Sequence, residues 1–381
     1  MLNLNTLISL PLTNGGPSYT CEQIVAAMAG DGLHCTLITP ADRRETLQTD
    51  VNVRTVVPRW ARKWPFRPTN IITQRRAETI LLQNCRSEQG RAAAYLWGNV
   101  SAGLGLEIKA TGAVLVREKF NCAMRVAREI LQRAYAGLNA SAHFPNDVYD
   151  DRLLHAEMES LKESDLIYCP SPMVAWSLEE IGIERSRMVM TSYGFDPARL
   201  SGDHQALSVI DAPTFIFVGY ICVRKGAHIL LEAWRRAGAR GRLVLLGKVE
   251  PMIADRFADV LARPDVEHHP FARDVGSYYR SADYFIFPSL EEGSPLVTYE
   301  AAFCGLPSIV SRMGAGAIVR DGIDGVIVDC DDIKSWTDAI ANAAAGGKPA
   351  ADQARQIRER SMQFTWDRVG AQRREQLVER L

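Results

Sequence analysis

The chain has 381 residues, 47% of them hydrophobic, which is enough for two cores and too long for one ordinary domain. Its 44 Lys and Arg nearly balance its 45 Asp and Glu, and the formal net charge is −1. Because no global field draws the molecule to a polyanion, a dedicated nucleic-acid binder is disfavoured. Eight scattered cysteines without a C-x-x-C pair predict reduced thiols, a cytoplasmic protein and no structural zinc.

The N-terminal stretch "MLNLNTLISLPLTNGG" lacks the basic start and the apolar length of a signal peptide. No apolar run approaches the ~20 residues that a membrane span needs. We therefore expect a soluble, cytoplasmic protein that could still contact the inner face of a membrane.

Short apolar runs alternate with amphipathic stretches, a pattern that predicts parallel strands joined by crossover helices. In the first half we expect strands at 7–11, 35–39, 51–57, 92–98, 113–118 and 166–171. In the second half we expect them at 214–219, 242–247, 266–271, 284–289, 307–311 and 325–329. Two such runs predict an α/β protein with two Rossmann-like lobes that face a cleft.

A stretch with little periodicity, near residues 195–212, predicts the linker between the lobes. We place the first lobe at 1–200 and the second at 201–362. The charged, amphipathic helix expected at 363–381 has no sheet of its own nearby, so we expect it to cross back and pack on the first lobe.

The segment "PSLEEGSPLVTYEAAFCGLP", from Pro288 to Pro307, contains the strongest candidate site. A buried strand ends at Pro288, and we expect a helix with Ser294 as its N-cap and Pro295 at its first position. This loop would deliver Glu292, Gly293 and Ser294 to the carboxyl edge of the sheet, where open α/β folds bind ligands. The helix N-terminus beside them suits a phosphate.

Glu300 lies further along the same expected helix, ~8 Å from the phosphate end. Carboxylates bind phosphate poorly but accept hydrogen bonds from vicinal hydroxyls. Two carboxylates that flank an anion site therefore suit a ligand with a sugar on each side of a phosphate, such as a nucleotide sugar. We expect the neighbouring Glu291 to be an ordinary solvated loop residue.

Residues suited to bind a phosphate or a sugar also follow two other expected strands. Gly219 ends one expected strand, and Arg224 and Lys225 precede the next helix, where cations oppose the helix dipole and are well placed to neutralise a diphosphate. In the first lobe Gly15 and Gly16 lie between the first strand and the first helix, where glycine permits close approach to a phosphate or sugar. The G-x-G-x-x-G spacing of a dinucleotide site is absent there.

In this order, the Gly-Gly loop, G-x4-R-K-G, E-x7-E and "VRDGIDGVIVD" resemble the retaining GT-B glycosyltransferases of family 4 over nearly the whole chain. The resemblance implies that Glu292, with the backbone of Gly293, Ser294, Pro295 and Leu296, holds the donor hexose and diphosphate. It also implies that Glu300 holds the ribose, that Arg224 and Lys225 bind the diphosphate, and that Gly16 approaches the donor from the first lobe. The catalytic set would be Glu292, Arg224 and Lys225, without a metal or other cofactor, and the departing phosphate would deprotonate the acceptor.

Three positions depart from the pattern of this family. Tyr220 stands where many relatives have an arginine, and Ala317 stands where many have a glutamate. The first-lobe segment in which relatives carry a histidine offers Cys122 instead; His143 lies further along and is expected to be a loop residue.

Basic and aromatic residues alternate in "VVPRWARKWPFRPTN", from Arg59 to Arg67. Such a segment suits an anionic membrane surface, where a lipid-linked acceptor would be found. A loop that faces water is the alternative interpretation.

The sequence thus predicts a glycosyltransferase that moves a sugar from a nucleoside diphosphate donor to a hydroxyl of a glycan or lipid-linked acceptor, in cell-surface polysaccharide or glycolipid synthesis. The alternatives are a non-catalytic nucleotide-sugar-binding protein, a GT-B phosphorylase or epimerase and, more remotely, a nicotinamide dehydrogenase. No nucleic-acid partner is expected.

Overall fold

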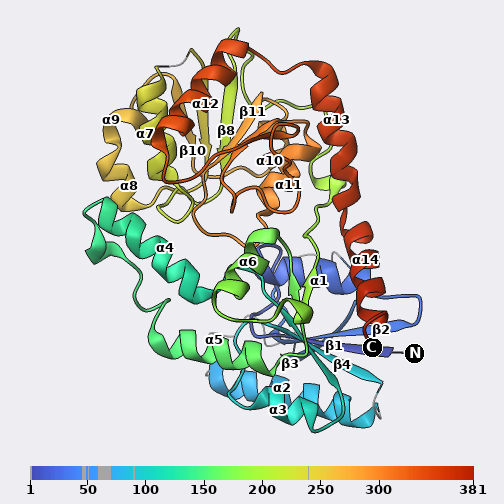
Figure 1. Ribbon diagram of the computed structural model, residues 1–381. Helices are drawn as coiled ribbons and strands as arrows, with labels where there is room; N and C mark the ends of the chain where they lie inside the picture. Colours follow the sequence, from blue (N-terminus) through green and yellow to red (C-terminus); the bar gives the residue numbers. More distant parts are fainter. Residues whose placement is uncertain (1, 45–48, 50, 59–69, 89–90, 239) are drawn as a thin grey trace.

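The computed structural model describes residues 2–44, 49, 51–58, 70–88, 91–238 and 240–381. It contains two parallel sheets, each covered by helices, so the predicted α/β class with two Rossmann-like lobes is confirmed (Figure 1). The basic and aromatic segment predicted to contact a membrane, Arg59 to Arg67, lies outside the described residues. Within the described residues, no helix has the length and apolar character needed to cross a bilayer.

The first sheet has seven strands in the order β3-β2-β1-β4-β5-β6-β7, all paired in parallel. Its strands are β1 Leu2–Ile8, β2 Leu33–Ala41, β3 Asn52–Val57, β4 Ala92–Trp97, β5 Val114–Glu118, β6 Leu166–Cys169 and β7 Met188–Met190. Its helices are α1 Gly16–Met28, α2 Asn70–Ser87, α3 Leu104–Lys109, α4 Met124–Gly137, α5 Asp151–Glu163 and α6 Pro172–Glu180, with 3-10 turns η2 Ser141–His143 and η3 Arg185–Arg187.

The second sheet has six parallel strands in the order β10-β9-β8-β11-β12-β13. Its strands are β8 Thr214–Val218, β9 Arg242–Leu246, β10 Val266–His269, β11 Tyr284–Phe287, β12 Ser308–Val310 and β13 Gly325–Ile327. Its helices are α7 Ala227–Ala237, α8 Pro251–Arg256, α9 Ala258–Leu261, α10 Val275–Tyr279, α11 Leu296–Phe303, α12 Ile333–Gly346 and α13 Ala351–Ser361. The 3-10 turn η4, Pro197–Arg199, precedes this lobe, and η5, Met362–Phe364, leads to the last helix, α14, Trp366–Val378.

Two strand predictions need correction. The first strand runs over Leu2–Ile8, not 7–11, because its buried residues begin at Leu4 and the chain leaves the sheet before Pro11. The strand β7 was not predicted, because it is three residues long and too short to show a periodic pattern.

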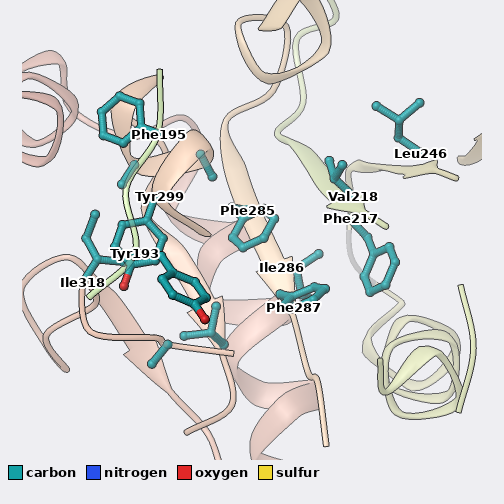
Figure 2. Close-up of a cluster of buried hydrophobic side chains, with 14 of the residues drawn as sticks. Tyr193, Phe195, Phe217, Val218, Leu246, Phe285, Ile286, Phe287, Tyr299 and Ile318 are labelled. Carbon is teal, nitrogen blue, oxygen red and sulfur yellow. The ribbon is translucent and has the colours of Figure 1, made fainter. Parts of the chain in front are cut away.

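The core of the second lobe is built from apolar strands buried on both faces. All five residues of β8 and of β9 are buried, as expected for parallel strands that helices cover on both sides. Figure 2 shows Phe285, Ile286 and Phe287 of β11 in one apolar cluster with Phe217 of β8. Tyr193 and Phe195, on the segment between the lobes, belong to the same cluster, so the two lobes share apolar contacts.

The last helix crosses back to the first lobe, where α14 packs beside α1 (Figure 1). The chain enters it through a bridge between Phe195 and Thr365. Trp366 then lies edge-to-face on Tyr19 of α1, with 6.1 Å between the ring centroids. The domain boundaries predicted at residues 200 and 362 stay predictions.

Two turns further along α14, Arg373 anchors the helix in the core of the first lobe. It is fully buried and forms an ion pair with Glu118, at the end of β5, at 2.9 Å. It also donates to the hydroxyl of Tyr95 at 3.0 Å and to the carbonyl of Ser192 at 3.0 Å. Burial alone would lower the pKa of Arg373, but the charge of Glu118, together with its hydrogen bond and the neighbouring Tyr95 and Tyr193, raises that pKa.

We predict that Arg373→Ala lowers the free energy of unfolding by roughly 3–5 kcal/mol, because it leaves the buried carboxylate of Glu118 without its cation. Urea unfolding followed by circular dichroism measures this. The matched control is Arg374→Ala on the same helix, whose partner Asp31 is exposed, and which should cost about 1 kcal/mol or less. Equal losses in the two variants would contradict the anchoring role of Arg373.

Candidate functional site

The two topological switch points position the candidate site. In the first sheet the strand order reverses between β1 and β4, and in the second between β8 and β11. Ligands of open α/β sheets bind in the crevice outside the carboxyl ends of such strands. Gly15 and Gly16 follow β1, Gly219 follows β8, and Glu292 follows β11, so these four predicted site residues lie in the loops at the switch points.

A cavity of about 320 Å³ lies between the lobes at these strand ends. Its lining from the second lobe includes the predicted donor-site residues Gly219, Arg224, Lys225, Glu292, Gly293, Ser294, Pro295 and Leu296. Its lining from the first lobe includes Gly16, Pro17, Thr20, Trp97, Phe120, Asn121 and Tyr193. We call this cavity the donor pocket. Gly15 and Glu300 do not line it.

The backbone of the Gly-Gly loop leaves room for a ligand. Gly16 has φ +68°, in the left-handed region that favours glycine, and a Cβ there would meet nothing within 4 Å. Gly15 is the N-cap of α1 in an extended conformation and makes no side-chain cap. Gly16 is therefore the residue of the pair that faces the donor pocket.

The loop after β11 is held by the loop after β8. The N–H of Leu290 donates to the carbonyl of Arg224 at 2.9 Å, and the hydroxyl of Ser289 donates to the carboxylate of Glu292 at 3.1 Å. Lys225 forms an ion pair with Glu292, and its ammonium lies 5.7 Å from the centroid of Phe287. These contacts bring the candidate carboxylate and cation to the same wall of the donor pocket.

Glu291 was expected to be a solvated loop residue, and this prediction was wrong. Its carboxylate is 1% exposed, forms an ion pair with Arg224 at 3.1 Å and accepts a weak hydrogen bond from Cys122 Sγ at 3.6 Å. Burial alone would lower the pKa of Arg224, but the charges of Glu291 and Glu292 raise it. Glu291 therefore fixes Arg224 from inside the protein.

The start of α11 also differs from the prediction. Pro295 is the N-cap and Leu296 the first helical residue, and no side chain caps this end. Ser294 instead shares a hydrogen bond of 2.6 Å with the hydroxyl of Tyr299, whose oxygen also accepts from the N–H of Ala317 at 3.1 Å. Because no side chain caps α11, N–H groups of its first turn remain to bind an anion, apart from that of Thr298, which donates to the carbonyl of Pro295 at 3.1 Å. The helix ends with Cys304 at the C-cap, and Gly305 follows at φ +80°.

Glu300 lies on α11 below the donor pocket. Its carboxylate accepts a hydrogen bond from Tyr279 at 3.2 Å. Burial raises the pKa of Glu300, and the positive charge of Arg199 and the hydrogen bond from Tyr279 oppose that shift. Arg199 on η4 was not identified from the sequence, because its proximity to Glu300 results from the connection between the lobes.

The two lobes contact each other at the donor pocket through backbone atoms. A Cβ on Gly293 would clash with the carbonyl of Phe120, and the hydroxyl of Ser171 donates to the carbonyl of Gly293. Glycine is required at 293 because only a hydrogen atom fits between the two backbone segments.

An aromatic wall from the first lobe was also missed. Trp97 stacks on Phe120 at 6.4 Å with an interplanar angle of 6°, and on Tyr193 at 6.4 Å with an angle of 17°. Trp97 ends β4, Phe120 follows β5 and Tyr193 follows β7. The strand-end rule, applied to aromatic residues, would have pointed to Trp97 and Phe120 singly, but not to their stacking with Tyr193, which follows the unpredicted strand β7.

The residues at the three departures from the pattern named above are placed as follows. Ala317 donates its N–H to the hydroxyl of Tyr299. Cys122 is buried, and burial together with Glu291 raises its pKa well above the ordinary value, so its thiol stays neutral. His143 is exposed on η2 and does not line the donor pocket. Tyr220 is 47% exposed and also lies outside that lining.

The chain resembles known glycosyltransferases in sequence. Residues 212–345 match the family described as "Glycosyl transferases group 1". A D-inositol 3-phosphate glycosyltransferase of Xylanimonas cellulosilytica is 31% identical over 178 residues, which cover 42% of this chain and 41% of that protein. The enzyme of the same name from Mycolicibacterium smegmatis is 30% identical over 228 residues, covering 55% and 52%. The chain thus matches about half the length or less of these curated relatives.

Solved structures resemble the whole chain. Sucrose-phosphate synthase from Thermosynechococcus elongatus superposes with a TM-score of 0.69 at 17% identity, covering 100% of this chain and 99% of that one. HepE of Anabaena in complex with UDP and glucose superposes with a TM-score of 0.68 at 15% identity, covering 100% of both chains. The predicted GT-B fold and the predicted resemblance to group 1 glycosyl transferases are confirmed.

We predict that Glu300→Gln stabilises the ligand-free protein at neutral pH. A carboxyl whose pKa is higher in the folded than in the unfolded chain loses stabilising free energy as pH rises through the folded-state pKa. In urea unfolding, the free energy of unfolding of the variant should therefore exceed that of the wild type. This difference should grow between about pH 4 and about pH 7, by roughly 1 kcal/mol for each unit of pKa shift. Glu180→Gln, on an exposed helix end, should show no such growth; a pH-independent difference for Glu300→Gln would refute the prediction.

Proposed function

We propose that this chain, whose second lobe matches the group 1 glycosyl transferases, transfers a sugar from a nucleoside diphosphate donor to a hydroxyl acceptor with retention of configuration. The observation that supports this most directly is the composition of the donor pocket. Backbone of both lobes, two cations, one carboxylate and an uncapped helix N-terminus converge on a space between two sheet switch points. The structural neighbour HepE was solved with UDP and with UDP-glucose, and we propose a uridine diphosphate donor here.

The diphosphate would bind where the first turn of α11, Arg224 and Lys225 face the pocket. Before a ligand binds, Lys225 is paired with Glu292 and Arg224 with Glu291. A diphosphate that attracts Lys225 would release Glu292 to accept hydrogen bonds from the donor hexose. The ribose hydroxyls would be held by Glu300, as the sequence predicts.

In the reaction, the bond between the anomeric carbon and the diphosphate oxygen breaks, and its electron pair stays on the phosphate. Arg224, Lys225 and the N–H groups of α11 stabilise that developing charge. The acceptor oxygen forms its bond to the anomeric carbon from the same face, and its proton passes to the departing phosphate oxygen. Glu292 orients the hexose, and Glu291 orients Arg224.

The acceptor in this proposal is a hydroxyl of a glycan or glycolipid, in cell-surface polysaccharide synthesis, made at the cytoplasmic side of a membrane. The curated relatives are named for inositol 3-phosphate, so a small phosphorylated acceptor is the alternative to a glycan. A nucleotide-sugar-binding protein without activity is the second candidate, since Cys122 stands where many relatives carry a histidine.

We predict that UDP raises the melting temperature of the wild-type protein and that Glu300→Ala and Lys225→Ala abolish most of that rise. A ligand at 100-fold its dissociation constant stabilises the folded state by about 2.7 kcal/mol. Differential scanning fluorimetry with UDP, GDP, ADP and NAD at one concentration measures it, with Glu180→Ala as the control that should respond like wild type. A shift by NAD alone, or by none of the four, would count against the donor site.

We further predict that turnover of the nucleotide sugar persists in excess EDTA, because Arg224, Lys225 and the α11 N-terminus supply the positive charge that the leaving diphosphate needs. Release of UDP from UDP-glucose, with the anomeric configuration of the product read by NMR, measures both points. Loss of turnover on chelation, restored by Mg²⁺, would show that a metal supplies this charge. Binding of UDP without any turnover would favour the non-catalytic alternative.

A further inference from the structure

Glu250 joins both lobes to the loop that follows β8, residues 219–226, which we call the cation loop. Glu250 follows β9 and is the N-cap of α8. Its Oε2 accepts a hydrogen bond from the N–H of Val223 at 3.0 Å, and its Oε1 accepts one from the hydroxyl of Tyr135 at 3.2 Å. Glu250 does not line the donor pocket, so its effect on a ligand there has to pass through these partners.

Within the cation loop, Val223 directly precedes Arg224 and Lys225, which line the donor pocket. Val223 is fully buried, so its N–H needs an acceptor inside the protein. The carboxylate of Glu250 supplies a charged acceptor, which makes a stronger hydrogen bond than a neutral one. The backbone N–H of Glu250 also donates to the carbonyl of Ile221 at 3.0 Å. Glu250 thus holds the cation loop by its main chain and by its side chain.

Tyr135 connects Glu250 to the first lobe. It lies on α4, is 5% exposed and packs edge-to-face on Phe144, with 5.9 Å between the ring centroids. Burial and the charge of Glu250 raise the pKa of Tyr135, so its hydroxyl keeps the proton that it donates. A second bond joins the same elements, since Nη1 of Arg256 on α8 donates to the carbonyl of Leu138 at 2.9 Å. The end of α4 therefore contacts α8 (Figure 1).

We propose that Glu250 is a positioning residue for the donor diphosphate: it fixes the cation loop through Val223, and Tyr135 holds its carboxylate in place while the lobes are together. The inference rests on the proposed function, since it concerns the cations of the same site. Without this carboxylate, the N–H of Val223 loses its acceptor, and the loop has to shift to reach another one. Arg224 and Lys225 then no longer face the phosphates together with the N-terminus of α11.

The effect of Glu250 should be confined to the diphosphate of the ligand. Glu300, the proposed ribose ligand, lies on α11 and outside the cation loop. UDP and uridine differ only in the diphosphate, so the dissociation constant of uridine divided by that of UDP measures what the diphosphate contributes. We call this quotient the diphosphate ratio. A dissociation constant does not depend on the fraction of protein that is folded, so a general loss of stability leaves the ratio unchanged.

Isothermal titration calorimetry with UDP, and displacement of UDP by uridine, tests the proposal. We expect Glu250→Ala to lower the diphosphate ratio roughly tenfold, with the affinity for uridine unchanged. Glu250→Gln should stay within about twofold of the wild type, because its amide oxygen can still accept from Val223. A diphosphate ratio that survives Glu250→Ala, or that falls as far in Glu250→Gln, would overturn the proposal.

Tyr135→Phe removes only the hydrogen bond from the first lobe and should lower the diphosphate ratio about twofold. Its control is Tyr284→Phe, which removes a hydroxyl that donates to the carbonyl of Gly347 at 3.0 Å within the second lobe, and which should leave the ratio unchanged. If Tyr135→Phe has no more effect than this control, the role assigned to Tyr135 is refuted.

Two further variants of α8 complete the test. Asp255→Ala removes an exposed carboxylate from the same helix and should leave the diphosphate ratio unchanged, whereas a fall as large as in Glu250→Ala would refute the role of Glu250. If Glu250→Ala does not fold, Glu250→Asp replaces it. Aspartate is a good N-cap for α8, but its carboxylate is one methylene too short to reach Val223 from the same position, so the ratio should again fall.

Hydrogen exchange of the ligand-free proteins separates this inference from the proposed function. Mass spectrometry of peptides that cover the cation loop should show faster exchange of the Val223 amide in Glu250→Ala but not in Glu250→Gln. If UDP does not bind the wild type while this protection depends on Glu250, the donor proposal fails and the support of the loop by Glu250 stands. If UDP binds and the protection is the same in Glu250→Ala, the donor proposal stands and this inference fails.

Discussion

The close contact between Gly293 and Phe120 is the constraint on which the candidate site depends. It brings the loop after β11 of the second lobe against the loop after β5 of the first, with no side chain between them. Ser171 strengthens it with a hydrogen bond to the carbonyl of Gly293. Because the contact is made by backbone, a side chain at 293 would separate the lobes and open the donor pocket along the wall that holds Glu292.

Around this contact, cations and carboxylates form ion pairs, and a charged ligand could replace one partner of a pair. Lys225 and Arg224 are held by Glu292 and Glu291 in the ligand-free protein, so the pocket is preorganised and close to neutral. A diphosphate would take over the cations and leave Glu292 to a sugar.

The helix that closes the chain supports the donor pocket indirectly. Arg373 of α14 holds Glu118 at the end of β5, and Phe120 and Asn121, which follow Glu118, line the donor pocket. A cation far along the sequence therefore fixes the strand end from which Lys119, Phe120 and Asn121 project. Stability and function are connected through this strand end.

Local pattern in the sequence was enough to predict the two lobes, the strand ends and the residues from Arg224 to Leu296, because strand length, glycine position and helix punctuation are encoded within short stretches. It could not predict that Glu291 is buried, that Ser294 bonds Tyr299 instead of capping α11, or that Trp97, Phe120 and Tyr193 form one wall. Those features join residues that are close only after the lobes pack together.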